Sequence, residues 1–283
     1  MRRSVIGWVM ALAVIAGLAV FRSGLPLAGG AAALTVLEVD GEVTRSRLET
    51  RNALEVGMSL EDNDLVTTGD AGRAVLGLGA ETRIRLGKGS DLQVVQLDDQ
   101  GLQIELKQGS VTATVRPSSQ FVRVTSRGRE VQATDAEFAV DVDGERLLVE
   151  TRRGTLMSRG VAGISGLSDG QSMWVEPSAD PKVLEVPGDL LLDVDWPEEA
   201  RTRETSATVR GHTAPGARIR VVSGAEEVSA VADRDGRFAV PVSLLEGANE
   251  VVVRARNSFG EEVEVVSSVI RDTSGPVFRG GIQ

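Results

Sequence analysis

The sequence has no cysteine, no tyrosine and a single histidine, and each absence excludes some chemistry. Without cysteine there is no disulfide framework, thiolate metal site, thiol nucleophile or lipid-modified cysteine. The lone His212, which we expect to be an exposed turn residue ahead of Pro215, argues against a catalytic triad or a histidine-based metal centre. A sugar-binding cleft usually presents aromatic faces, yet beyond residue 33 only Trp174, Trp196 and a few phenylalanines remain.

The chain is acidic, with a formal net charge of -10 and a pI near 4.8. Its 31 basic residues are scattered among acidic ones rather than gathered into a stripe, so we expect no nucleic-acid partner. A length of 283 residues suits two domains of ordinary size. The hydrophobic content of 41% and the charged content of 25% are typical of a globular protein.

The N-terminus has the composition of an export signal. Arg2 and Arg3 precede an uncharged, largely apolar run from Val5 to Phe21, and a small-residue stretch follows at 28–33. The run reaches the lower limit for crossing a bilayer, so residues 1–33 are either a cleaved signal peptide or a retained membrane anchor, and we favour the anchor slightly. Both alternatives predict that the chain from Leu34 onward is periplasmic or exposed on the cell surface.

Between residues 34 and 176 short segments alternate between apolar and polar residues, with glycines between them. Clear examples are Arg83 to Leu86, Leu102 to Leu106, Val111 to Val115 and Phe138 to Val142. A period of two residues indicates half-buried strands, and no segment has a long helical period. The pattern predicts an antiparallel all-β module.

The same residues resemble the FecR domain family. The resemblance rests on an ordered series of motifs: Gly57, the turn from Asn63 to Gly69, the strands Ala74 to Leu78 and Glu81 to Leu86, a mid-domain glycine turn from Lys107 to Val111, and closing hairpins at Phe138 to Val140, Val149 to Gly154 and Leu167 to Gln171. One departure is Asp135-Ala136-Glu137-Phe138, where the family usually has glycine and threonine.

The resemblance implies an extracytoplasmic all-β module, named from regulators that relay iron-uptake signals to a sigma factor. Such a relay needs a folded cytoplasmic domain ahead of the membrane span, whereas only Met1 to Ser4 precede the apolar run. We therefore expect that this role does not transfer, and that the module binds partners or acts as a scaffold.

Prolines cluster at 177–189, which we predict to be a linker, and a second set of alternating segments follows at 190–273. This second set resembles bacterial Ig-like domains in its turns, which include Pro215-Gly216 and Asp235-Gly236. The first suits a type II turn, and the second suits a tight hairpin between the strands on either side. The predicted fold is an Ig-like β-sandwich, followed by a flexible tail at 274–283.

Two acidic turns, Asp141-Val142-Asp143-Gly144 and Asp233-Arg234-Asp235-Gly236, have the spacing of carboxylates in calcium loops. Neither completes an EF-hand pattern, and aspartate with glycine commonly closes a β-turn, which is the interpretation we favour. Trp174 and Trp196 lie beside predicted domain ends and are expected to pack at a domain junction. No catalytic, cofactor-binding or metal-binding residue is assigned.

The sequence therefore predicts a non-enzymatic protein of the bacterial cell envelope that binds or scaffolds, with envelope proteins or peptidoglycan as partners. The alternative is an extracytoplasmic sensor component of a transmembrane signalling system. A weaker alternative is a glycan-binding accessory protein or hydrolase.

Overall fold

The computed structural model describes residues 33–117, 120–177, 179–186, 188–196 and 201–273. These ranges contain strands and no helix, which confirms the predicted all-β class. They also contain no helix that is long and apolar enough to span a bilayer. The apolar run from Val5 to Phe21 and the tail at 274–283 lie outside the described residues. All described residues belong to one compact unit.

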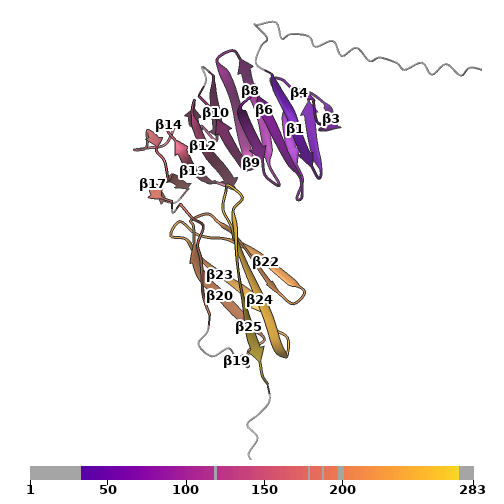
Figure 1. Ribbon diagram of the computed structural model, residues 1–283, viewed down its shortest axis with the longest axis vertical. Helices are drawn as coiled ribbons and strands as arrows, with labels where there is room; N and C mark the ends of the chain where they lie inside the picture. The colour runs from indigo at the N-terminus through magenta and orange to yellow at the C-terminus, as the bar shows by residue number, and fades with distance from the viewer. Residues whose placement is uncertain (1–32, 118–119, 178, 187, 197–200, 274–283) are drawn as a thin grey trace, which may run out of the picture. The chain divides into compact units, whose positions relative to one another are not determined.

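The strands β1 to β17, residues 34–185, form what we call the first module (Figure 1). Its strands are β1 (Leu34–Asp40), β2 (Val43–Arg47), β3 (Thr50–Ala53), β4 (Ser59–Leu60), β5 (Leu65–Thr68), β6 (Arg73–Leu78), β7 (Thr82–Leu86), β8 (Asp91–Asp98), β9 (Gly101–Val115), β10 (Phe121–Ser126), β11 (Arg129–Ala133), β12 (Ala136–Asp143), β13 (Arg146–Gly154), β14 (Leu156–Arg159), β15 (Gly166–Leu167), β16 (Gln171–Glu176) and β17 (Ala179–Glu185).

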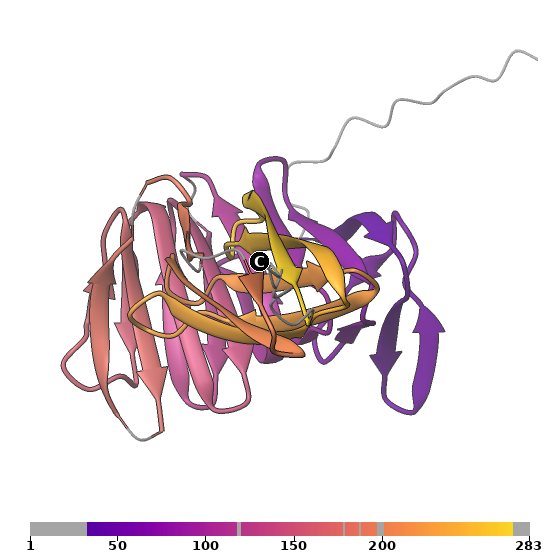
Figure 2. The ribbon, with the colours of Figure 1, turned by 90° about the horizontal axis from the view of Figure 1, so that it is seen from below.

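These strands are arranged in two layers that share one strand. Sheet A has the hydrogen-bonded order β4-β1-β6-β7-β9-β12-β13-β16-β17. Sheet B has the order β3-β2-β5-β8-β9-β10-β11-β14-β15. Figure 2 shows successive strands of this module running side by side. Inward-facing residues of both layers form one core, since every second residue of strands such as β10 is buried.

The strand β9 corrects two predictions. The segments 102–106 and 111–115 were expected to be separate strands around a glycine turn, but they are halves of one strand of 15 residues. Its first half pairs in sheet B and its second half in sheet A, and the change occurs at Gly109, whose φ is 85°. Gly109 is therefore a bend within a strand, where the backbone passes close to Ser90.

The sequence pattern predicts a purely antiparallel module, but the structure contains a parallel pair of strands within it. The strands β9 and β10 run parallel, with Phe121 opposite Gly101 and Thr125 opposite Glu105. A parallel pair requires a crossover rather than a hairpin, and here the second half of β9 lies in sheet A before the chain returns to sheet B. The alternation of apolar and polar residues within one strand does not indicate whether its neighbour runs parallel or antiparallel to it.

The segment 177–189, predicted to be a linker, contains β17. This strand pairs antiparallel with β16, and Trp174 lies opposite Lys182. Its proline, Pro181, is tolerated because β17 is an edge strand whose outer N–H groups need no partner in the sheet. The domain boundaries that we proposed around this segment stay predictions.

The strands β18 to β25, residues 192–271, form what we call the second module. They are β18 (Leu192–Asp195), β19 (Arg201–Thr202), β20 (Ser206–Thr213), β21 (Arg218–Ser223), β22 (Glu226–Val231), β23 (Arg237–Ser243), β24 (Gly247–Arg256) and β25 (Glu262–Arg271). One sheet has the order β18-β20-β23, and the other has the order β19-β25-β24-β21-β22. Apolar residues of both sheets, Val240 and Val253 among them, form a shared core.

Of the two turns predicted for the second module, the structure has one as predicted and one with a different connection. Gly216 has a φ of 75° and lies in a turn closed by Ala217 N donating to Ala214 O, as expected for a type II turn. The turn at Asp235-Gly236 connects β22 to β23, which belong to different sheets, so the predicted hairpin between them is wrong. The chain crosses between layers here because β23 pairs with β20 and β22 pairs with β21.

Candidate functional site

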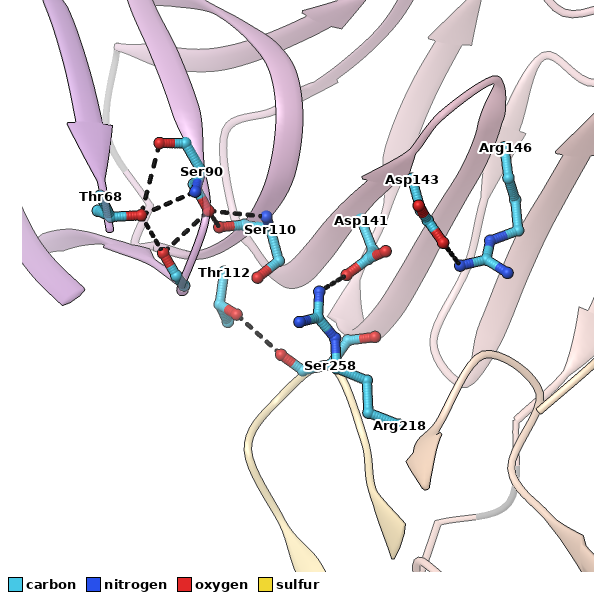
Figure 3. A network of polar contacts seen from close by, with 10 residues as sticks. Thr68, Ser90, Ser110, Thr112, Asp141, Asp143, Arg146, Arg218 and Ser258 are labelled. Atoms are coloured by element: carbon cyan, nitrogen blue, oxygen red, sulfur yellow. Dashed lines mark hydrogen bonds and ion pairs between the residues drawn. The ribbon is translucent and has the colours of Figure 1, made fainter. Parts of the chain in front are cut away.

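The turn from Gly87 to Ser90 is held by buried hydroxyl groups (Figure 3). Thr68 Oγ1 donates to Gly87 O at 2.7 Å and accepts from Ser90 N at 2.8 Å. Ser90 Oγ donates to Gly87 O and Ser110 O and accepts from Ser110 N. Thr68 belongs to the Asn63 to Gly69 motif, so that motif fixes the turn that presents Lys88 at the surface.

Asp64, in the same motif, anchors the neighbouring turn. Its side chain is fully buried and accepts from Arg47 Nε at 2.5 Å, from Arg47 Nη2 at 2.6 Å and from Glu61 N at 2.9 Å. Burial alone would raise the pKa of this carboxyl, but these hydrogen bonds and the charges of Arg45 and Arg47 hold the pKa below its ordinary value. The role of Asp64 is therefore structural.

One face of sheet A packs on sheet B, and the opposite face carries the contacts with the second module. On that face Leu148 and Trp174 are buried although they lie outside the core of the first module. Gly216 of the second module lies against them, because a Cβ added there would overlap Leu148 and come within 3.3 Å of Trp174. Trp174 thus packs at the junction between modules, as the sequence predicts.

Polar contacts surround this apolar centre, and Figure 3 shows two of them. Arg218 Nη2 donates to Asp141 Oδ2 at 2.8 Å, and Thr112 Oγ1 donates to Ser258 O at 3.1 Å. On the other side, Arg152 Nη2 donates to Glu261 Oε1 at 2.6 Å. The guanidinium carbon of Arg152 also lies 4.1 Å from the ring centre of Phe259, within cation–π range.

Glu150, on β13 between these contacts, is a buried carboxyl with 3% of its surface exposed. Burial is the largest effect on its pKa and raises it to about 7, helped by the charge of Asp141 and opposed by a hydrogen bond from Ser258 and the charge of Arg152. Its Oε2 atom has no hydrogen-bond partner among the described residues. The junction therefore encloses an acid that titrates near neutral pH.

Beside the junction lies an open cleft of about 640 Å³, which we call the junction cleft. Its walls come from β6, β7, the turn 87–89, β9, β12 and β13 of the first module and from β21, β22, β24 and the turn 257–260 of the second module. Arg85, Lys88 and Arg256 are among the side chains that line it. No group of three metal-ligating side chains occurs among the residues that the structure describes.

The residues singled out from the sequence do not form one site. His212 is exposed, as expected, but it lies in β20 rather than in a turn, and its Nε2 is 2.7 Å from Asp235 O. In the first acidic motif, Asp143 accepts from Arg146 at 2.7 Å. In the second, Asp233 Oδ1 accepts from the backbone N–H groups of residues 235 and 237, which are the contacts of a closed turn.

Trp196 is partly buried against the core of the second module and does not join Trp174 at the junction. The junction residues missed from the sequence, Glu150 above all, lie in uninterrupted buried runs at 147–151 and 172–175. A strand buried on consecutive residues has both faces covered. The apolar runs Leu147 to Val149 and Met173 to Val175 were the available signal that another part of the chain covers sheet A.

Comparison with known proteins supports the resemblance found in the sequence for part of the chain. Residues 64–157 match the family model of the FecR protein, which takes in β5 to the middle of β14. The resemblance proposed for 34–176 is thus confirmed for 64–157, and the Ig-like resemblance has no such match. No curated protein matches the chain.

Two crystal structures of a protein of Parabacteroides distasonis, described as a candidate anti-sigma factor, resemble the chain weakly. Both have a TM-score of 0.40, with sequence identities of 14% and 13%. Each alignment covers 44% of this chain and 60% of that protein. At this level the likeness carries no argument about fold or function.

Proposed function

We propose that the chain is a non-enzymatic sensor component of a transmembrane signalling system, with its two β modules outside the cytoplasm. The observation that carries this proposal is the match of residues 64–157 to the family model of the FecR protein. The resemblance to this family implies a relation to regulators that relay signals. The match favours this alternative over the scaffold that the sequence first suggested. The expectation that the signalling role would not transfer rested only on the few residues ahead of the apolar run.

The junction supports a sensor because a ligand there contacts both modules. The described contacts between the modules are one small apolar centre at Gly216 and a few polar pairs such as Arg218 with Asp141. Such partly polar interfaces within a chain permit relative motion of domains. A ligand in the junction cleft can shift an equilibrium between two arrangements if it binds one of them more tightly.

For the second module we propose an Ig-like sandwich. Its first, third and sixth strands form one sheet, and the four longer strands of the other sheet have the order β25-β24-β21-β22. With β18, β20 and β23 as strands A, B and E, and β21, β24 and β25 as strands C, F and G, this order supports the Ig-like arrangement.

Export is part of the same proposal. The run from Val5 to Phe21 would act either as a retained anchor or as a leader that is cut in the small-residue stretch 28–33. Mass spectrometry of the mature protein distinguishes the two, since an anchor leaves the N-terminus intact and cleavage leaves a new N-terminus near residue 31 or 34.

Transcript profiling of a deletion strain tests the sensor function. We expect a small, reproducible set of transcripts to change when the gene is deleted and to return when the full-length chain is expressed. Unchanged transcripts together with an envelope defect, or with retention of the full-length protein on peptidoglycan sacculi, would instead favour the scaffold. Hydrolysis of a glycan by the purified protein would contradict the non-enzymatic part of the proposal.

A further inference from the structure

The junction cleft carries excess positive charge, unlike the chain as a whole. In the part of the chain that the structure describes, eight basic and four acidic residues line it, although the net charge of the whole chain is -10. Three of the four acids lie within ion-pair distance of arginines that also line the cleft: Asp141 with Arg218, Asp143 with Arg146, and Glu262 with Arg254. The remaining charge favours an anionic ligand.

Four basic side chains in the cleft have no ion-pair partner within the described part of the chain. Arg73, Arg85 and Lys88 belong to the first module, and Arg256 belongs to the second. Arg73 and Arg85 are exposed, while Lys88 and Arg256 are half-buried. Unpaired guanidinium groups are strong, often bidentate donors to carboxylates, and they are available here from both walls.

The walls that carry these groups are well fixed. Lys88 lies in the turn that Thr68 and Ser90 hold by hydrogen bonds to Gly87. Arg85 lies opposite Thr112 in sheet A, and Thr112 is itself hydrogen-bonded to Ser258 of the second module. Within the first module a ligand therefore meets donors whose positions are largely set in advance, which lowers the entropic cost of binding.

The chemistry of the lining favours a protein segment over a glycan. Phe259 is the only aromatic side chain among the described residues that line the cleft, and its ring is already covered by Arg152 at 4.1 Å. The edge strand β22 lines the cleft through Ser229, Ala230 and Val231, and among the described strands it is hydrogen-bonded only to β21. An extended segment can add to such an edge through its backbone.

We propose that the junction cleft binds an extended acidic segment of a partner protein, which pairs with β22 and places its carboxylates on Arg85, Lys88 and Arg256. This inference rests on the proposed sensor function for its biological meaning, since the segment would be the signal that is sensed. Its binding chemistry stands on the cleft alone.

The test uses the purified full-length protein in nonionic detergent micelles and a fluorescein-labelled polyglutamate peptide of about ten residues, roughly 30 Å when extended. Fluorescence anisotropy should show saturable binding that weakens with salt, because screening reduces the attraction of exposed charges. The double variant Arg85→Glu with Arg256→Glu should weaken binding at least about tenfold. Arg210→Glu is the matched control and should bind as the unaltered chain does, because Arg210 is an exposed residue of β20 outside the cleft with no ion pair to any described residue.

Three further measurements separate loss of binding from loss of folding and locate the bound peptide. Thermal unfolding of each variant establishes that it folds, and Arg85→Gln with Arg256→Gln gives a second test without charge reversal. Hydrogen exchange should show that the peptide protects the amides of 229–231. Equal binding by the cleft and control variants, or binding of polyphosphate without the peptide, would overturn the inference. Peptide binding with unchanged transcripts in the deletion strain would leave the inference standing and refute the sensor function.

Discussion

The buried carboxyl of Glu150 should lower the stability of the folded chain as the pH rises, and one substitution should remove this dependence. Its pKa of about 7 in the folded chain exceeds the ordinary value of 4.5 because burial disfavours the ionised form. Below pH 4.5 the group is protonated in both folded and unfolded chains, so it has no effect on the free energy of unfolding. Between pH 4.5 and 7 ionisation of Glu150 lowers the free energy of unfolding by an increasing amount, and above pH 7 this loss reaches its full size.

The size of this effect follows from the two pKa values. Each pKa unit corresponds to about 1.4 kcal/mol, so the full cost of ionised Glu150 is about 3 kcal/mol. Glu150→Gln keeps the shape of the protonated acid and an oxygen that accepts from Ser258, but it never ionises. We therefore expect the variant to be more stable than the unaltered chain by up to about 3 kcal/mol at pH 8, and close to it at pH 5.

Urea denaturation of the full-length protein, followed by circular dichroism at both pH values, measures this difference. The matched control is Glu105→Gln on β9, a half-buried glutamate with no ion pair among the described residues, which should have the same small effect at both pH values. A Glu150→Gln effect that is equal at pH 5 and pH 8, or destabilising at pH 8, would refute the reasoning.

Three further substitutions test the packing by the same denaturation. Asp64→Asn should cost about 2 kcal/mol, because it removes the buried charge that accepts hydrogen bonds from Arg47 and from Glu61 N, and a loss below about 1 kcal/mol would contradict that role. Gly216→Ala should cost about 2 kcal/mol, since the added Cβ would overlap Leu148 and the φ of 75° disfavours alanine; no loss would mean that the junction is not packed this way. Leu48→Gly should stabilise by about 1 kcal/mol, because Leu48 is 98% exposed at a φ of 52°, and a destabilised variant would contradict this.

Local periodicity was a good guide to single strands and a poor guide to how they connect. The alternation at Phe138 to Val142 predicted part of β12, because one face of that strand packs in the core. The glycine at 109 was interpreted as a turn because a bend inside a strand has the same local chemistry. What distinguishes the two is the backbone around Ser90 that passes it, about twenty residues earlier in the chain.

The contacts at the junction could not be predicted from the sequence for a similar reason. Arg218 and Asp141 are separated by 77 positions, and Thr112 and Ser258 by 146, so no local pattern relates them. The sequence did predict that Trp174 packs where modules meet, because a large apolar side chain near a domain end needs cover. It gave no sign that scattered arginines gather in one cleft, since that depends on which strand faces adjoin.

The central claim, that this chain senses a signal through the junction cleft, is tested most directly by replacing the chromosomal gene with the Arg85→Glu and Arg256→Glu double variant. We predict that this strain changes the same transcripts as the deletion strain, while a strain carrying Arg210→Glu keeps the pattern of the unaltered strain. If the double variant accumulates to normal levels and leaves every transcript unchanged, the claim is contradicted.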